Sequence, residues 1–182
     1  MVWSCLVSIL PGMAQTEKLT DYVNPFVGTD GYGNVYPGAQ IPFGGIQISP
    51  DTDSRFYDAA SGYKYNHLTL MGFSLTHLSG TGIPDLGDFL FIPGTGEMKL
   101  EPGTHEDPDQ GYRSRYSHDK EWASPNYYAV ELADYGVKAE MTSGVRSGMF
   151  RFTYPESDNA FIMIDMNHTC LLYTSPSPRD CS

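Results

Sequence analysis

Cysteine is almost absent from this 182-residue sequence, where it occurs only as Cys5, Cys170 and Cys181. Residues 6–169 therefore contain neither a disulfide nor a thiolate metal site. Avoidance of cysteine is typical of proteins in an oxidising compartment, where stray thiols would form incorrect disulfides.

Basic residues and long apolar runs are also scarce. The 11 Lys and Arg residues stand against 22 Asp and Glu residues, which gives a net charge of −11. Because nucleic-acid binding requires clustered Lys and Arg, this composition argues against a nucleic-acid partner. An apolar stretch at residues 2–10 is too short for a membrane span, so no membrane span is predicted.

That apolar stretch predicts a signal peptide over residues 1–14. Gly12 and Ala14 supply the small residues of a cleavage site, but the basic segment that usually opens a signal peptide is missing. The peptide is therefore interpreted as truncated at its start, and a buried first strand is the alternative. A signal peptide predicts a periplasmic or secreted protein.

Long amphipathic helices are not evident between residues 16 and 167, whereas strand patterns recur with Gly, Pro, Asn and Asp between them. Residues 137–142 and 150–154 alternate apolar and polar side chains, as half-buried strands do. Further strands are expected at residues 46–48, 89–92, 128–132 and 160–166. The first two of these end at a proline, and the last is apolar on both faces, which indicates a buried strand. This spacing predicts an all-β fold, an antiparallel β-sandwich.

Two segments depart from the strand pattern. Residues 97–126 combine acidic residues with several basic ones, which predicts a surface excursion with local ion pairs. Residues 170–182 resemble a translated sequencing adapter, and a natural disordered tail is the alternative. The expected domain therefore covers residues 15–169 and is incomplete. Three widely spaced histidines are interpreted as surface residues: His67, His105 and His118.

Residues 72–82 form the segment with the most unusual composition, because His77, several hydroxyl side chains and three glycines follow one another closely. Such a segment suits a loop that turns sharply and presents polar groups to a ligand. His77 is expected to hydrogen-bond a ligand hydroxyl, and a histidine satisfied within the turn is the alternative. Asp85 suits either a pocket wall or a turn, and Asp88 is interpreted as a turn-capping residue.

Two other loops carry candidate residues. Residues 51–58 contain three aspartates but lack the Gly and the terminal Glu of an EF-hand loop, so a turn is favoured over a calcium site. Asp58, Ser61 and Tyr63 are expected to contact a ligand there. Residues 28–34 are glycine-rich without the ending of a phosphate loop, and they suit either a pocket-lining loop or a plain turn.

Several motifs occur in a fixed order: YVNPFVGT (22–29), YPGA (36–39), PFGGIQISPDT (42–52), SGYKY (61–65), the segment 72–88, GYRSRYSH (111–118) and ASPNYY (123–128). Together they make residues 21–168 resemble glycoside hydrolase family 92. The chain differs from many members at Ala60, where the family often has Cys. It also has residues 79–82 where some members carry a Trp, so linkage preference is not transferred from those members.

The resemblance implies an exo-acting α-mannosidase that inverts the anomeric centre and requires calcium. Such enzymes consist of an N-terminal β-sandwich packed on an (α/α)6 barrel. Inversion requires an acid and a base about 6.5–9.5 Å apart. The barrel, which is missing here, is implied to supply both carboxylates and the calcium site, so no catalytic or metal-ligating residue is expected in this chain. The implied substrate-binding residues, which would contact α-mannoside glycans, are Asp58, Ser61, Tyr63, His77, Ser79, Gly80, Thr81 and Asp85.

Three functions follow from this interpretation. The favoured one is an N-terminal fragment of a secreted or periplasmic α-mannosidase that is inactive alone. The second is a free-standing carbohydrate-binding β-sandwich, and the third is a structural interaction module. Binding of mannosides would separate the first two from the third.

Overall fold

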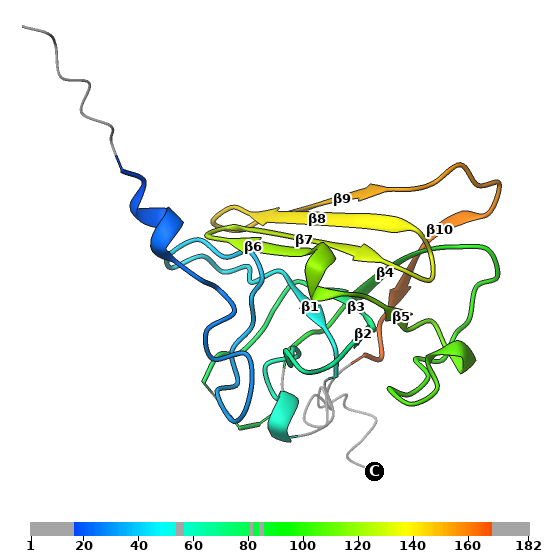
Figure 1. Cartoon of the computed structure of the whole chain (residues 1–182), viewed down its shortest axis with the longest axis horizontal. Coiled ribbons are helices and arrows are strands. Elements are labelled where there is room, and N and C mark those ends of the chain that lie inside the picture. Colours follow the sequence, from blue (N-terminus) through cyan, green and yellow to red (C-terminus); the bar gives the residue numbers. More distant parts are fainter. Residues whose placement is uncertain (1–16, 54–56, 81, 84–85, 169–182) are drawn as a thin grey trace, which may run out of the picture.

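The computed structural model describes residues 17–53, 57–80, 82–83 and 86–168 and shows an all-β fold (Figure 1). The predicted signal peptide at residues 1–14 and the predicted tail at 170–182 lie outside the described residues. Two four-stranded antiparallel sheets form two layers, and a two-stranded sheet accompanies them. The antiparallel β-sandwich predicted from the sequence is therefore confirmed.

One layer is a meander of consecutive strands in the order β6-β7-β8-β9. Its strands are β6 (Glu121–Ser124), β7 (Tyr127–Leu132), β8 (Val137–Ser143) and β9 (Gly148–Thr153). The strands predicted at 128–132, 137–142 and 150–154 are confirmed here. Asn126 in the β6–β7 turn has a φ of 61°. Its side-chain amide donates to the carbonyl of Ser143 at 2.8 Å, which ties the turn to the end of β8.

The second layer combines strands that are distant in sequence, in the order β1-β3-β4-β10. Its strands are β1 (Ser49–Asp51), β3 (Gly72–Ser74), β4 (Leu90–Thr95) and β10 (Ala160–Asp165). The two-stranded sheet pairs β2 (Thr69–Leu70) with β5 (Ser114–Arg115). The second layer lies below the meander in the view of Figure 1.

Two strand ends in this layer differ from the prediction. The strand expected at residues 89–92 continues through Pro93 to Thr95, because β3 pairs with β4 only at Phe73–Phe91. Beyond Phe91 only β10 borders β4, so a proline without an N–H can remain in the strand. The strand expected at 46–48 begins later, at Ser49, and Ile48 forms only an isolated bridge to Ala39.

The main core lies between the two sheets. Side chains alternate between the two faces of a strand, so every second side chain points into the interior. The rings of Phe150 and Phe152 on β9 pack there against Phe73 on β3, with centroid distances of 6.4 Å for Phe150 and 6.1 Å for Phe152. A second, smaller cluster covers the other face of the second layer. The buried residues of the main core include Ile48, Leu70, Phe73, Tyr128, Val130, Val137, Ala139 and Met141.

Two further sequence-based expectations need correction. Residues 160–166 were expected to form a buried strand, but Ile162 and Ile164 are 53% and 52% exposed. The reason is that β10 is an edge strand of its sheet. Residues 97–126 do form local ion pairs at Arg115, but they also place the fully buried Arg113 side chain beneath β1, where its Nη1 donates to the carbonyl of Thr52 at 2.5 Å.

Helical structure among the described residues is limited to short 3-10 turns, and no helix there has the length and apolar character needed to cross a membrane. These turns are η1 (Leu19–Tyr22), η2 (Tyr57–Ala59), η3 (Pro108–Gln110) and η4 (His118–Lys120).

Candidate functional site

The loop segments singled out in the sequence meet where β1 ends. Asp51 is the last residue of β1, and His77 follows β3 closely enough for its ring to fold back over the β1–β3 pair. Asp51, Ser74, His77 and His168 form one buried polar group here, which we call the Asp51 cluster. Its members come from the end of β1, the end of β3, the loop after β3 and the segment after β10.

Both ring nitrogens of His77 are engaged by the protein. Nδ1 lies 2.7 Å from the carbonyl oxygen of Gln47, and Nε2 lies 2.9 Å from Oδ1 of Asp51 and 3.0 Å from Oγ of Ser74. A carbonyl oxygen only accepts, so Nδ1 faces the acceptor Gln47, while Nε2 faces the carboxylate of Asp51 and the hydroxyl of Ser74. The imidazole ring is therefore held between a carbonyl and a carboxylate.

Asp51 is the electrostatic centre of the cluster. Its side chain is 2% exposed, and its Oδ2 lies 3.5 Å from Nε2 of His168. Burial alone would raise the pKa of Asp51, but the opposing charge and hydrogen bonds of His77 and His168 hold that pKa well below its usual range. The carboxylate is thus kept ionised between two imidazoles and fixes the loops that carry them.

Gly62 allows the next loop to pack directly on this cluster. Its φ is +86°, and a Cβ there would lie 2.2 Å from Oδ1 of Asp51 and 2.9 Å from Cδ2 of His77. The Gly62 carbonyl accepts the N–H groups of Thr52 and Asp53 at 2.7 and 3.2 Å. Only glycine satisfies both the positive φ and the lack of space, so the 61–65 loop is locked onto the end of β1.

The glycine-rich residues 28–34 form an outer support for the same loops. Gly80 N–H donates to the carbonyl of Asn34 at 2.7 Å, and Nζ of Lys64 donates to the carbonyl of Gly31 at 2.6 Å. The ring of Tyr36 lies 5.0 Å from the ring of His77, centroid to centroid. Residues 28–34 thus pack against the candidate loops, and a role in lining a pocket stays a prediction.

A second polar layer lies behind Thr52 and Asp53. His67 Nδ1 lies 3.0 Å from Oγ1 of Thr52, His105 Nε2 lies 3.3 Å from Oδ2 of Asp53, and the two imidazole centroids are 4.0 Å apart. His118 is also half-buried, with Nδ1 2.6 Å from Oε2 of Glu121. These three histidines, interpreted as surface residues, are partly exposed, and each also interacts with a polar group of the protein.

The predicted site residues occupy different environments. His77 is buried, so a direct contact between a ring nitrogen and a ligand would require exchange of a protein partner. Ser79 and Gly80 are exposed at the rim directly after it. Ser61 and Tyr63 are buried, with the Ser61 hydroxyl donating to the carbonyl of Val35 at 3.1 Å and the Tyr63 hydroxyl donating to Glu121 at 2.9 Å.

The remaining predicted residues fall outside what the structure describes. Thr81 and Asp85 are not among the described residues, and for Asp58 only the backbone, within η2, is described. Ligand contact therefore stays a prediction for all eight residues.

Sequence reasoning missed two members of the cluster and one rim residue. Asp51 was interpreted as part of a turn, and His168 was not considered, because neither has its partners nearby in sequence. Tyr57 is exposed, and its ring fills the space beside Gly82, where a Cβ would lie 2.3 Å from Cε2. The position of this tyrosine within the candidate loop 51–58 was the available indication in the sequence.

Metal binding was tested against the donor groups of this chain. The described residues contain no group of three or more His, Cys, Asp or Glu side chains placed to hold a metal ion. We therefore derive no step through calcium from this chain. The buried, charged Asp51 cluster supports the loop that carries the exposed Ser79 and Gly80. Such a loop suits binding of a neutral polar ligand.

Known proteins resemble this chain over the whole region that contains these loops. Residues 22–176 match the family described as the glycosyl hydrolase family 92 N-terminal domain. An uncharacterised secreted glycosidase of Arthroderma benhamiae is 30% identical over 139 residues, which cover 75% of this chain and 17% of that protein.

Solved structures give the same result. The family GH92 inverting mannosidase from Bacteroides thetaiotaomicron VPI-5482 superposes with a TM-score of 0.67 at 28% identity, over 82% of this chain and 20% of that one. The GH92 family glycosyl hydrolase ccman5 also gives a TM-score of 0.67, at 30% identity over 81% of this chain and 20% of that one. The chain thus spans about a fifth of the length of these relatives.

Proposed function

The chain belongs to glycosyl hydrolase family 92, whose N-terminal domain it represents, and on that premise we propose that it is the pocket-shaping part of an α-mannosidase. The observation that carries the proposal is the match of residues 22–176 to this domain, together with a structural relative that is an inverting mannosidase. The whole enzyme would act on terminal α-mannosyl residues of glycans.

The chemistry of inversion belongs to the part of the enzyme beyond this chain. Inverting hydrolysis needs an acid and a base on opposite sides of the scissile bond, about 6.5–9.5 Å apart, with a water between them. Asp51 is shielded from solvent and engaged by two imidazoles, so it is unsuited to that role. We assign both carboxylates and the calcium ion, with its usual oxygen ligands, to a C-terminal (α/α)6 barrel.

This chain would supply the rim of the mannose pocket. Ser79 and Gly80 are exposed and follow His77 of the Asp51 cluster closely in the chain, and the Gly80 N–H is anchored to Asn34. The 61–65 loop is locked beside them by Gly62. Such preorganisation lowers the ordering cost of binding, because the loops are already held in position before a sugar arrives.

Activity and binding assays with the 182-residue chain test the proposal. We expect no hydrolysis of 4-nitrophenyl α-mannoside, with or without calcium, because the catalytic carboxylates are assigned elsewhere. Methyl α-mannoside at high concentration should raise the melting temperature, whereas methyl α-galactoside should not, because a ligand that binds only the folded state stabilises it. Ser79→Ala should reduce the mannoside effect.

Two results would contradict the proposal. Calcium-dependent turnover by the purified chain would show that it contains the catalytic groups itself. Equal or absent effects of the two methyl glycosides would favour a structural interaction module.

A carbohydrate-binding β-sandwich that works alone is the remaining alternative, because it would also bind mannosides. Sequencing the source DNA beyond codon 169 separates the two. A frame that continues for several hundred residues with a helical pattern supports the enzyme. A genuine stop codon after residue 182 supports the free-standing module.

Secretion or export to the periplasm is part of the same proposal. A similar protein, the glycosidase of Arthroderma benhamiae, is a secreted protein, and residues 6–169 contain no cysteine. Because the basic segment of the signal peptide is missing, sequencing of the source DNA upstream of codon 1 tests it. A basic segment in frame with residues 1–14 supports export, and its absence would contradict it.

A further inference from the structure

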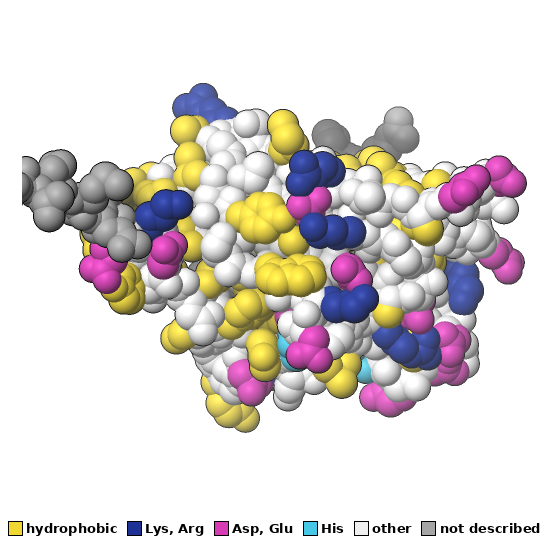
Figure 2. Space-filling model, turned by 45° about the horizontal axis from the view of Figure 1, so that its top comes forward, with side chains coloured by type: hydrophobic (Ala, Val, Ile, Leu, Met, Phe, Trp, Pro, Cys, Tyr) yellow, Lys and Arg dark blue, Asp and Glu magenta, His cyan; other side chains and the backbone are white. Residues whose placement is uncertain are grey.

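The outer face of the β6–β9 sheet carries a second group of polar and aromatic side chains. Strand register places Trp122, Ala129, Glu140 and Arg151 in one cross-strand row, and Tyr127, Thr142 and Met149 in the neighbouring row. With this layer turned toward the viewer, Figure 2 shows yellow side chains beside a line of alternating blue and magenta ones. None of these residues belongs to the Asp51 cluster.

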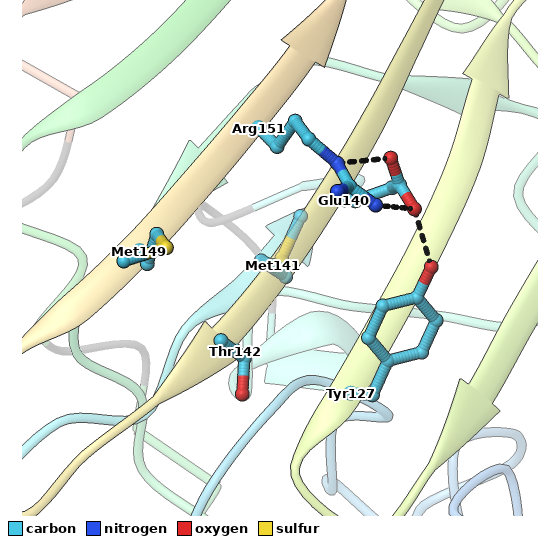
Figure 3. A pocket seen from close by; sticks show the side chains of 6 residues that line it. All are labelled: Tyr127, Glu140, Met141, Thr142, Met149 and Arg151. Atoms are coloured by element: carbon cyan, nitrogen blue, oxygen red, sulfur yellow. Dashed lines mark hydrogen bonds and ion pairs between the residues drawn. The ribbon is translucent and has the colours of Figure 1, made fainter.

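A shallow pocket of about 180 Å³ opens in this face, and Figure 3 shows its lining. We call it the outer-face pocket. The side chain of Met149 and the ring of Tyr127 give it apolar walls, and a charged pair lies at one end. Met141 lies at its floor, with its side chain in the main core. Its lining residues are Tyr127, Glu140, Met141, Thr142, Met149 and Arg151.

The polar end of the pocket is held rigidly. Arg151 donates from Nε to Oε2 of Glu140 and from Nη2 to Oε1, both at 2.7 Å, and the Tyr127 hydroxyl donates to Oε1 at 2.7 Å. The Glu140 side chain is only 9% exposed although it lies on an outer face, because Arg151 and Tyr127 cover it. A bidentate pair fixed in this way presents the remaining guanidinium donors and carboxylate lone pairs in defined directions.

The chemistry of the lining selects a neutral ligand with one apolar face. Glu140 and Arg151 compensate each other's charge, and the protein as a whole carries a net charge of −11, which repels anions. Aromatic and methionine side chains accept flat apolar surfaces, whereas the Arg–Glu pair bonds hydroxyl groups at the edge. A pyranose ring of a neutral glycan combines these two features.

We propose that the outer-face pocket is a second glycan-binding site, which holds one neutral hexopyranose residue with its apolar face on Tyr127 and Met149 and its hydroxyls on Arg151 and Glu140. This goes beyond the proposed function, and only the choice of mannose as the sugar rests on it. A second site of this kind would hold a branched or polymeric glycan on the protein and raise its effective concentration there.

Trp122 supplies a direct readout of binding. Its indole is 46% exposed, it lies in the same row as Glu140, and Nζ of Lys138 lies 5.9 Å from its ring centroid. Trp3 is the other tryptophan of the chain, so Trp3→Phe leaves Trp122 as the single tryptophan, which can be excited selectively over the tyrosines. In this background, methyl α-mannoside should shift the Trp122 emission in a saturable way with a Kd of about 1 mM, as expected for so small a ligand.

Variants separate this site from the Asp51 cluster. Arg151→Ala should weaken binding at least tenfold, whereas Arg115→Ala, an arginine paired with Asp109 and Asp134 elsewhere, should leave it unchanged. If Arg151→Ala does not fold, Met149→Lys provides the test, because Met149 is largely exposed and a lysine there would obstruct the pocket. Thr153→Lys on the same strand is its charge-matched control.

The outcomes are distinct from those of the proposed function. A saturable Trp122 response that Ser79→Ala preserves and Arg151→Ala or Met149→Lys abolishes supports the second site. Absence of any saturable response, or a response that both pocket variants retain, overturns it. Loss of the Trp122 response in Ser79→Ala also overturns it, because the signal would then report the rim of the Asp51 cluster.

Discussion

Gly62 shows how a single residue determines the geometry of the candidate site. Gly62→Ala combines a strained positive φ with a Cβ 2.2 Å from Oδ1 of Asp51. The strain alone costs about 1 kcal/mol, and the overlap should add roughly 1–3 kcal/mol. Gly31→Ala is the matched control, because its φ is +60° and no atom lies within 4 Å of its added Cβ. Urea unfolding should therefore show a clearly larger loss for Gly62→Ala, and equal losses would contradict the packing of the 61–65 loop on Asp51.

Asp51 allows a test of the charge balance within the cluster. Asp51→Asn leaves His77 and His168 without their carboxylate, and removal of one partner from a buried pair typically costs about 3–5 kcal/mol. Asp109→Asn, in an exposed pair with Arg115, should cost far less, because solvent screens that pair. Chemical denaturation at pH 7 measures both. A small effect of Asp51→Asn would show that the cluster does not hold an ionised carboxylate.

The sequence identified part of this site because local composition carries information about loops. His77, Ser79 and Gly80 were found from the glycines and hydroxyl groups around them. Asp51 and His168 were missed as members because they are far apart in the sequence. They meet only after β1 has paired with β3 and the segment after β10 has folded against them. The buried state of Ser61 and Tyr63 depends equally on distant partners, Val35 and Glu121.

The β8–β9 pair carries a pH-dependent contribution at the scale of the element. Hydrogen bonds from Arg151 and Tyr127 lower the pKa of Glu140 to about 2, from an ordinary value of about 4.3. Because the pKa of Glu140 is lower in the folded state, the ion pair stabilises the fold fully when the pH is above the ordinary pKa. This contribution is lost as the pH falls from about 4.3 toward 2. Amide exchange in β9 should therefore accelerate in Glu140→Gln relative to wild type at pH 6, with a smaller difference at pH 3.

Glu131→Gln provides the control for that measurement. Glu131 lies on the same sheet and pairs with Lys120, but both side chains are well exposed, so its removal should change β9 exchange little at either pH. Equal behaviour of the two variants would indicate that the Arg151–Glu140–Tyr127 arrangement does not stabilise the edge of the sheet.

Strand prediction succeeded for strands with a single buried face. It failed where the exposure or the end of a strand depends on the neighbouring strands of its sheet. The alternation in β7, β8 and β9 was sufficient, because each of these strands has one face in the core. In β10 both faces are apolar, which indicated burial, yet its position at the sheet edge leaves Ile162 and Ile164 half exposed. Likewise Pro93 did not end β4, because the structure leaves that part of the strand with one partner only.

At the scale of the whole molecule, the sandwich is open along the edge formed by β10. The exposed Ile162, Ile164 and Met166 follow this edge, and the chain spans only about a fifth of its family 92 relatives in length. Unpaired apolar strand edges recruit other chains. We therefore expect the 182-residue chain to self-associate, and Ile162→Lys to shift it toward monomer, because charge on an edge strand opposes strand pairing.

Light scattering coupled to size-exclusion chromatography measures this shift across a range of protein concentrations. Thr20→Lys adds the same charge at an exposed position of η1, outside both sheets, so it should change association far less. The comparison matters because net charge alone also affects solubility, and the wild-type chain is acidic, so any added lysine brings its net charge closer to zero. If both variants behave alike, association does not proceed through the β10 edge. A monodisperse wild-type monomer with a sharp, reversible melt would show that the sandwich is stable without a covering partner.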